Sequence, residues 1–573
     1  MKKKIIFILV LSLLMSIIAG CNSSDVVSEP EIETVVSEPP ASIETEAASE
    51  PSKGAELMPG DTEPQPEEDE VQEETIIQYP IDTFETLSFC TKYSANDCSN
   101  LAPSTEESAV WIAAAEATGV HISVVDINAW TYDEQIALML ASDDMTDMML
   151  GFVGYYPTGV DAAIEDNMII NIADYLELCP DYSKLIARDE YRNEVTTDNG
   201  AIGAFYGLDE SDPSVSFGMY IRSDYLNKVG LDNPVTVDDM ETVLSAFKTE
   251  LGLQYPIYLG SNNISACLTG AWDVPKLSGL NLVQINGEVT AAPFMSSFDD
   301  AISTLADWYS KGLISSDFVG IDGSFVFLPA PYTAAVTGGT TGVFLGGTTT
   351  IDSLYDNGIS NDPNWSVAAI PTPVMEKGQI IHAGEDPLSK LSGDHVSISA
   401  SCENIELAVM WCNYFFTPEG SLLASYGIEG ESFTYNDNNE PWLMEYAYTG
   451  DDQYTKGQKY MNWLSIPFGL YMPERSAASY SDYYFMAKDT WNSNLDHSYM
   501  LSSSYSMTAD EAELYNAIAL NIETYMEESI LKFITNEMPL SELDTFRETM
   551  INIGYNDMIA IVQTAYDRYL ARD

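Results

Sequence analysis

The stretch VHISVVDINAWTYDEQIALMLASDDMTDMML, residues 120–150, decides the fold class of this chain. Residues 120–126 are rich in β-branched side chains and predict a strand, and residues 148–150 predict another. Between them, four residues share one face at helical spacing: Tyr132, Ile136, Met139 and Leu140. Because strand and helix alternate, we expect an α/β fold with parallel-rich sheets flanked by helices, and ligands at the carboxyl ends of the strands.

The flanking sequence continues this alternation. Its apolar patterns predict a strand at 86–93 and helices at 106–118, 237–250, 297–311 and 402–416. Trp308 and Trp411 fall within two of these helices, which favours core packing over ligand binding. The Gly/Thr-rich stretch 337–350 lacks the lysine of a phosphate-binding loop, so we interpret it as turns around a buried strand.

The first 21 residues, MKKKIIFILVLSLLMSIIAGC, have the pattern of a secretory signal. Lysines precede an apolar run from Ile5 to Ile18, which is too short to span a bilayer comfortably. The run ends in Ala-Gly-Cys21 and resembles the lipobox of bacterial lipoproteins, although Ile18 stands where that pattern usually has leucine. We therefore expect a signal peptide over 1–21 and a lipidated Cys21, which would hold the protein on the extracellular face of the cytoplasmic membrane.

Residues 22–78 predict a tether. This segment is rich in Ser, Glu and Pro, and it repeats the motif VVSEP at 26–30 and 35–39. It cannot bury enough apolar surface to order itself, and its prolines and like charges favour an extended chain. We expect a disordered acidic stalk between the membrane and the folded part.

The charge balance excludes several ligand classes. The 573-residue chain has 23 Lys and Arg against 89 Asp and Glu, a formal net charge of −66. A surface this acidic repels nucleic acid and anionic lipid, so we expect no nucleic-acid partner and a neutral or cationic solute.

The cysteines and histidines predict no metal or cofactor site. The four histidines are isolated, and no cysteine pair has C-x-x-C spacing. Export permits disulfides, and Cys90 and Cys98 are close enough in sequence to close a small loop, but spacing does not give the pairing. Apart from Cys21, the cysteines are Cys90, Cys98, Cys179, Cys267, Cys402 and Cys412.

Several strings, taken in order, resemble extracellular solute-binding proteins (family 1) of carbohydrate ABC importers, and more closely their long lipoprotein branch. The matching strings lie at 136–147, 164–170, 197–200, 222–231, 234–240, 417–420, 427–430 and 563–569. The loop at 142–147 departs from the family's usual sequence. Some relatives carry a calcium loop after the helix corresponding to 237–250, but here residues 251–256 hold no carboxylate cluster, so no metal site is carried over.

The resemblance implies two α/β lobes joined by crossing strands: a two-lobed, periplasmic-binding-protein-like fold that holds a solute in the cleft between the lobes and releases it by hinge opening. By that pattern the first lobe takes 79–210 and 393–425, and the second takes 211–392 and 426–573. The resemblance implies a monomeric, membrane-anchored lipoprotein. It would capture a carbohydrate, which we expect to be an oligosaccharide, and deliver it to the permease subunits of an ABC importer.

A sugar site needs flat aromatic platforms and polar groups in fixed positions. Trp130, Tyr155 and Tyr156 follow predicted strands, and Trp272 with Asp273 would offer a platform and an acceptor in the second lobe. We expect Trp130 and Trp272 to enclose a sugar ring; local packing is the alternative for each. Further candidates lie near the lobe crossing or in predicted loops: Arg222, Trp365, Glu429, Trp463 and Arg475.

Two other classes of protein share some of these features. A glycoside hydrolase needs two carboxylates at a fixed separation, and no motif singles out such a pair. The sequence also lacks a G-x-S-x-G elbow and an H-E-x-x-H motif, so we expect no enzymatic activity. A surface glycan-binding or solute-sensing lipoprotein without a transport role would share the anchor and the stalk, and it remains the alternative.

Overall fold

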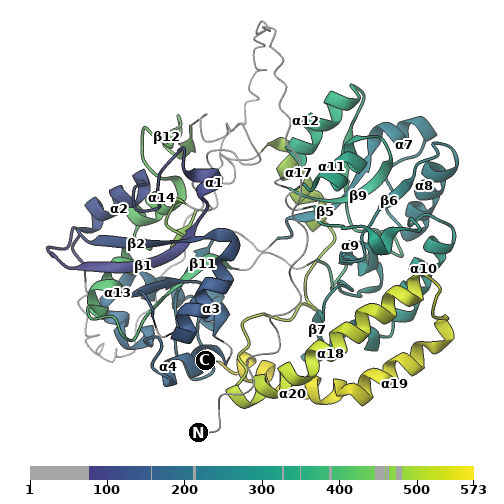
Figure 1. The fold of residues 1–573 in the computed structure, drawn as a ribbon. Helices are drawn as coiled ribbons and strands as arrows, with labels where there is room; N and C mark the ends of the chain where they lie inside the picture. The colour runs from purple at the N-terminus through teal and green to yellow at the C-terminus, as the bar shows by residue number, and fades with distance from the viewer. Residues whose placement is uncertain are drawn as a thin grey trace, which may run out of the picture. The chain divides into compact units, whose positions relative to one another are not determined.

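Two β-sheets, each covered by helices, organise the folded chain (Figure 1). The computed structural model describes residues 76–142, 144–156, 158–210, 214–325, 328–348, 350–385, 390–444, 459, 464–472 and 481–572. The signal segment, Cys21 and nearly all of the tether lie outside these residues. Within the described part of the chain, no helix is long and apolar enough to cross a membrane.

The first sheet has six strands in the order β14-β4-β11-β3-β1-β2. Their bounds are β1 Thr86–Tyr93, β2 His121–Asn128, β3 Met148–Leu150, β4 Phe205–Asp209, β11 Leu391–Ile398 and β14 Leu470–Tyr471. β1 pairs in parallel with β2 and β3, whereas β11 runs antiparallel to β3 and β4, and β14 is parallel to β4. The carboxyl ends of β1 to β4 and the amino end of β11 therefore meet at one edge of the sheet. The strands predicted at 86–93, 120–126 and 148–150 are confirmed.

Helices and one hairpin cover the first sheet. They are α1 Ala95–Cys98, α2 Ala109–Thr118, η1 Ala129–Thr131, α3 Tyr132–Ser142, η2 Phe152–Tyr155, α4 Gly159–Glu165, η3 Ile172–Leu178, α5 Pro180–Ile186, α6 Asp189–Val195, α13 Ile405–Tyr414, α14 Pro418–Tyr426, β12 Phe433–Tyr435 and β13 Pro441–Leu443. Trp411 is fully buried against Phe89, with ring centroids 6.1 Å apart, which confirms its expected core position.

The second sheet has four strands in the order β10-β5-β9-β6. Their bounds are β5 Phe217–Arg222, β6 Tyr255–Tyr258, β9 Thr341–Gly347 and β10 Val367–Ile370. β6 and β9 are parallel, and β5 is antiparallel to both β9 and β10. Every residue of β9 is buried, which confirms that the Gly/Thr-rich stretch contains a buried strand. Gly342 is required there, because a Cβ atom would lie 2.2 Å from the ring of Phe247.

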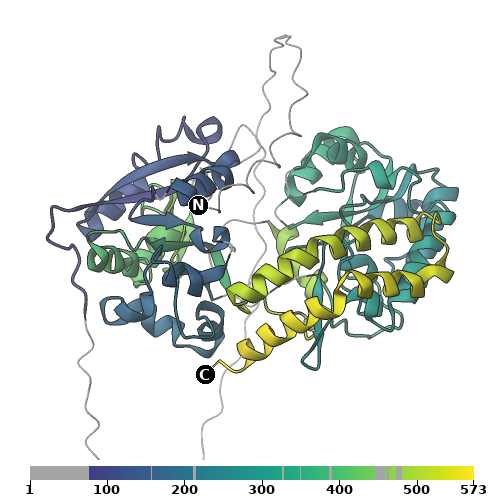
Figure 2. The same ribbon diagram turned by 60° about the horizontal axis from the view of Figure 1, so that its bottom comes forward.

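The second sheet is surrounded by a larger set of helices. They are α7 Ser223–Val229, α8 Val237–Thr249, α9 Ala266–Thr269, η4 Gly270–Trp272, η5 Ala292–Phe294, α10 Phe298–Ser310, η6 Phe318–Gly320, α11 Ala330–Thr337, α12 Ile351–Asn361, α17 Asp482–Asn492, α18 Ala509–Ile534, η9 Leu540–Glu542, α19 Leu543–Ile553 and α20 Tyr555–Leu570, with a hairpin of β7 Leu282–Ile285 and β8 Glu288–Ala291. α8 and α18 both begin with a capping box, Thr236 with Asp239 and Thr508 with Glu511. In Figure 2, α18 and α20 lie side by side, in agreement with their contacts.

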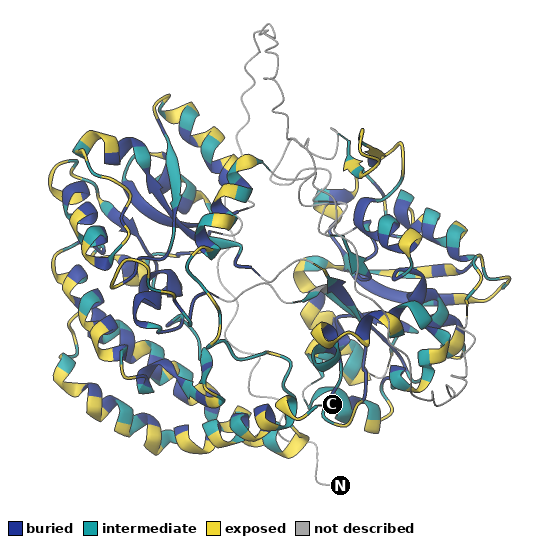
Figure 3. Cartoon of the chain, turned by 180° about the vertical axis from the view of Figure 1, so that it is seen from behind, coloured by how far each residue is buried: buried dark blue, intermediate teal, exposed yellow. Residues whose placement is uncertain are grey.

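Each sheet has its own apolar core, and Figure 3 shows buried strands beneath helices whose outer faces are exposed. We call the part around the first sheet the first lobe and the part around the second sheet the second lobe. The expected split at 425/426 differs from the structure, because β14 pairs with β4 in the first sheet and Ile466 and Phe468 belong to the first core. The described residues 464–471 therefore belong to the first lobe. A two-residue strand has no periodicity that a sequence pattern could reveal.

Candidate functional site

An ion pair stands at the edge of the first sheet where the strands end. The ammonium of Lys92, the penultimate residue of β1, lies 3.2 Å from Oδ1 of Asp394 in β11. Their side chains are 29% and 40% exposed, so both remain accessible to a solute. Lys92 also lies 5.1 Å from the ring centroid of Tyr132. Neither Lys92 nor Asp394 was a candidate from the sequence.

Two tyrosines follow β3 at the same edge, as the sequence indicated. Tyr155 donates a hydrogen bond from its hydroxyl to Oδ1 of Asp133 at 2.5 Å, and its ring lies 6.2 Å from that of Tyr132. Burial, and then Asp133, raise the pKa of Tyr155. Tyr156 donates to Oδ2 of Asp166 at 2.5 Å. Burial, and then Asp166, raise the pKa of Tyr156 to about 12, so both phenols are neutral donors at physiological pH.

Trp130 follows β2 at this edge. It lies in η1, where Oδ1 of Asn128 accepts a hydrogen bond from its backbone N–H at 2.9 Å. Its side chain is 61% exposed, which is unusual for tryptophan in a folded protein. An exposed indole beside the strand ends fits the stacking platform expected from the sequence.

His395 is a further polar residue at this edge. It stands opposite Tyr206 on β4, with ring centroids 5.4 Å apart. Its Nε2 atom is buried and has no hydrogen-bond partner among the described residues. Burial lowers the pKa of His395, so the imidazole is neutral at physiological pH. No sequence pattern singles out this residue, because an isolated histidine is not informative by itself.

In the second lobe, Trp272 and Asp273 are engaged within the protein. Trp272 is only 8% exposed and belongs to the apolar core, so it offers little surface to a solute. Asp273 has a left-handed backbone, with φ of 54°, and accepts the backbone N–H of His382 at 2.7 Å. Its Oδ2 also lies 3.1 Å from Nδ1 of His382. These contacts fit the alternative of local packing better than the expected platform and acceptor.

Arg222 and Trp365 are also buried. The Arg222 side chain is 1% exposed and donates to Asp224 from Nε at 2.7 Å and from Nη2 at 3.0 Å. Its guanidinium lies 3.9 Å from the ring centroid of Tyr225 and 5.4 Å from that of Trp365. The ion pair lies within the second lobe, and neither candidate side chain presents a surface to a solute in this structure.

Of the three remaining candidates, one lies among the described residues. Glu429 is exposed next to the hairpin of β12 and β13, between Gly427 and Gly430, which both have positive φ. Trp463 and Arg475 lie outside the described residues.

Polar side chains also follow β6 in the second sheet. Asn262 donates from Nδ2 to Oδ1 of Asp322 at 3.0 Å, and its own Oδ1 accepts the backbone N–H of Gly323 at 2.9 Å. Hydrogen bonds from Ser324, and then from Asn262, lower the pKa of Asp322. This fixed carboxylate and amide pair is a further polar group that the sequence patterns did not single out.

The cysteines do not form the small loop that their spacing permits. Cys90 Sγ contacts the hydroxyl of Tyr132 at 3.6 Å, and Cys98 Sγ contacts the carbonyl of Lys459 at 4.0 Å. All six described cysteines are buried. Among the described residues, no group of three or more His, Cys, Asp or Glu side chains is arranged to hold a metal ion.

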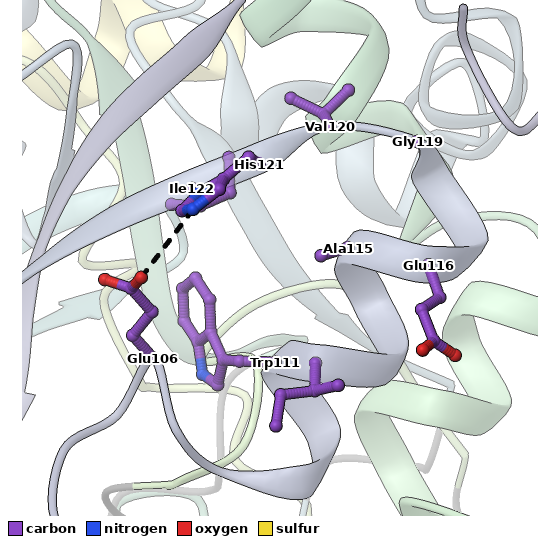
Figure 4. A pocket seen from close by; sticks show the side chains of 9 residues that line it. Glu106, Trp111, Ala115, Glu116, Gly119, Val120, His121 and Ile122 are labelled. Carbon is purple, nitrogen blue, oxygen red and sulfur yellow. Dashed lines mark ion pairs between the residues drawn. The ribbon is translucent and has the colours of Figure 1, made fainter. Parts of the chain in front are cut away.

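A separate pocket of about 380 Å³ lies between α2 and the start of β2 (Figure 4). It is lined by Glu106, Trp111, Ile112, Ala115, Glu116, Gly119, Val120, His121 and Ile122. Nε2 of His121 lies 3.9 Å from Oε1 of Glu106 across its rim. β2 advances about 3.3 Å per residue, so the pocket and Trp130 lie roughly 25 Å apart at opposite ends of the strand. The pocket is therefore not part of the edge that carries Lys92.

Comparisons with known proteins agree with this architecture. No protein-family model matches the sequence. The chain is 22% identical over 537 residues to the fructooligosaccharide ABC transporter substrate-binding protein FusA of Streptococcus pneumoniae, covering 86% of this chain and 92% of FusA. It is 26% identical over 222 residues to Lipoprotein LipO of Bacillus subtilis, covering 36% of this chain and 41% of LipO. The chain thus matches less than half the length of LipO.

Solved structures give the same result. FusA of Streptococcus pneumoniae in complex with kestose has a TM-score of 0.66 at 21% identity, covering 85% of this chain and all of that chain (100%). An extracellular solute-binding protein from Bifidobacterium longum subsp. infantis has a TM-score of 0.66 at 18% identity. The match covers 84% of this chain and 98% of that protein's chain.

This chain therefore has the two-lobed fold of extracellular solute-binding proteins, and the expected fold class is confirmed. Within that class, it is similar over most of its length to a substrate-binding protein of an ABC transporter, as the sequence resemblance indicated.

Proposed function

We propose that this protein captures an oligosaccharide outside the cell and delivers it to the permease of an ABC importer. The observation that carries the proposal is the set of side chains at the strand ends of the first sheet: an exposed indole, two neutral phenols and an accessible ion pair. Sugars present apolar C–H faces and a rim of hydroxyl groups, and these side chains supply a stacking surface and fixed hydrogen-bonding groups. The similarity to FusA, whose name specifies fructooligosaccharide, supports a carbohydrate ligand.

The proposed site in the first lobe consists of Lys92, Trp130, Tyr155, Tyr156 and Asp394, which we call the sugar-edge cluster. Tyr155 and Tyr156 already donate their hydroxyls to carboxylates, so they are held in fixed orientations. Lys92 and Asp394 neutralise each other and present both a donor and an acceptor. Trp272, Asp273, Arg222 and Trp365 are left out of the proposed contacts because the protein itself occupies their surfaces.

We further propose that Cys21 carries a lipid and that the tether holds the lobes outside the membrane. The lysine-rich apolar N-terminus and its Ala-Gly-Cys end support this, and so does the similarity to a protein named Lipoprotein LipO. The proposed partners are the oligosaccharide, the membrane through the lipid and the transmembrane permease subunits. The protein acts as a monomer, and it binds its ligand without transforming it.

The decisive experiment is a thermal-shift screen of the purified chain against neutral oligosaccharides. A ligand that binds only the folded state raises the melting temperature by mass action. Each hit is then incubated at length with the protein and followed by chromatography. Reversible stabilisation with full recovery of the sugar supports the proposal. Steady product formation would instead indicate a hydrolase, and the lack of any stabilising oligosaccharide would contradict the carbohydrate ligand.

A further inference from the structure

A network of charged side chains ties the C-terminal segment of the second lobe to the first lobe. Asp198, which follows α6 in the first lobe, accepts hydrogen bonds from two arginines. Its Oδ1 accepts from Nε and Nη2 of Arg572 at 2.9 and 2.7 Å, and its Oδ2 accepts from Nε of Arg568 at 2.7 Å. The side chains of Asp198 and Arg572 are 15% and 4% exposed, so this contact is largely shielded from water.

The second lobe holds the arginines in place. Glu511, in the first turn of α18, accepts from Nη1 and Nη2 of Arg568 at 2.8 and 2.6 Å. These hydrogen bonds lower the pKa of Glu511 and raise that of Arg568. Nη1 of Arg572 donates to the carbonyl of Ser504 at 3.0 Å and, across to the first lobe, to that of Asn193 at 2.7 Å.

A second carboxylate of the first lobe, that of Glu194 in α6, contacts the same C-terminal segment. Glu194 accepts a hydrogen bond from the hydroxyl of Tyr569 at 2.6 Å and from Oγ of Ser504 at 2.5 Å. Two acidic residues of the first lobe thus meet a C-terminal segment that holds two arginines. We call this set the C-terminal joint: Glu194, Asp198, Glu511, Arg568 and Arg572.

Pulling the joint apart is unfavourable. It would leave the shielded carboxylate of Asp198 without its two arginines and the guanidinium of Arg572 without a carboxylate, whereas Arg568 would keep Glu511. The desolvation of unpaired charges is costly. Basic residues are scarce in this chain, which has 23 Lys and Arg against 89 acidic residues. Two of these basic residues, Arg568 and Arg572, lie in the C-terminal joint. A rotation of one lobe against the other that keeps these hydrogen bonds is therefore favoured over a movement that separates α20 from α6.

We propose that the C-terminal joint is a fixed pivot, about which the two lobes rotate while the end of α20 stays on the first lobe. This inference rests on the proposed function, since capture and release of a solute require the lobes to move. The joint lies apart in sequence from the segments that cross between the sheets, which run from β4 to β5, from β10 to β11 and from β14 to α17. It adds a non-covalent restraint to those covalent connections.

Distances between spin labels test the pivot in the full chain carrying Cys21→Ala and no added sugar. One pair of introduced cysteines, at Asp189 and Leu570, spans the joint from exposed positions on α6 and α20. A second pair, at Ile112 on α2 and Asp356 on α12, links the lobes elsewhere. The native thiols of the described residues are buried, so labelling is directed to the new cysteines. We expect a narrow distance distribution for the joint pair and a broader one for the second pair.

Asp198→Asn should broaden the distribution of the joint pair at least twofold. The matched control is Asp299→Asn, which removes a carboxylate from Arg547 entirely within the second lobe and should leave both distributions unchanged. If Asp198→Asn disrupts folding, as judged by circular dichroism, Arg572→Met provides the same test from the other lobe. The pivot is overturned if, in the parent chain, the distance distribution of the joint pair is as broad as that of the second pair. It is also overturned if the distribution of the joint pair is unchanged in both variants. Because no sugar is added, failure of the pivot and failure of carbohydrate binding remain separate results.

Discussion

The ammonium of Lys92 lies 3.2 Å from the carboxylate of Asp394, although 302 residues separate the two positions in the chain. Lys92 reaches the edge of the first sheet at the end of β1. Asp394 reaches the same edge near the start of β11, when the chain returns from the second lobe and runs antiparallel to β3. The sugar-edge cluster is therefore complete only after this return.

Removing either charge of this pair should weaken sugar binding more than it weakens the fold. The pair is partly exposed, and such pairs contribute about 0.2–1 kcal/mol to stability. We expect Lys92→Met and Asp394→Asn each to lower affinity about tenfold in calorimetry, with little change in melting temperature. The exposed pair of Lys532 and Glu528 in α18 supplies a control, because Glu528→Gln should alter neither quantity. Unchanged affinity in both Lys92→Met and Asp394→Asn would remove the pair from the proposed site.

Trp130→Ala should cost affinity without costing stability. The indole is mostly exposed, so its loss leaves no cavity, whereas a stacking platform contributes about 1–3 kcal/mol, or roughly ten- to a hundredfold in affinity. Calorimetry and thermal unfolding of the empty protein measure the two effects. Leu138→Ala, at an equally exposed position on α3, is the control. A lowered melting temperature with unaltered affinity would contradict the stacking role.

Trp272→Ala should do the opposite. Because this tryptophan is buried in the second core, its truncation should lower the free energy of unfolding by about 3–5 kcal/mol. Chemical denaturation measures the loss. If stability is unchanged while affinity falls sharply, Trp272 would return to the site as the partner of Trp130.

His395 should make stability depend on pH just below neutrality. Its pKa in the folded protein is lowered from the ordinary value of 6.5 by burial, so the unfolded chain takes up the proton first. The stability associated with the neutral imidazole is fully present above pH 6.5 and is lost as the pH falls from there through the folded pKa. Denaturation midpoints between pH 7 and 5 should fall less steeply for His395→Gln than for the parent. Parallel slopes would show that His395 does not titrate differently in the two states.

Cys21→Ala should release the protein from the membrane. Without the thiol no lipid is added, so the variant should be shed or retained as a precursor with altered mobility. Cell fractionation and immunoblotting follow its fate. Membrane association and mobility equal to those of the parent would contradict the lipid anchor.

The alternating pattern of residues 120–150 predicted strands and a helix that the structure contains, because local periodicity reports which face of an element is buried. The same pattern could not separate Trp130 from Trp272. Both are aromatic residues in short 3-10 helices, and only the tertiary packing buries one and exposes the other. Asp394 was missed because its role depends on a crossing between lobes, and the place of β14 in the first sheet depends on pairing with a distant strand.

Strand β2 forms the outer edge of the first sheet, and its free side has no strand partner among the described residues. Such an edge can pair with the same edge of another molecule and start aggregation. Its exposed positions are His121, Ser123, Val125 and Asn128, so one exposed apolar residue stands among polar ones and there is no continuous apolar row. The net charge of −66 also makes neighbouring copies repel one another. The acidity of this chain therefore opposes self-association along this edge.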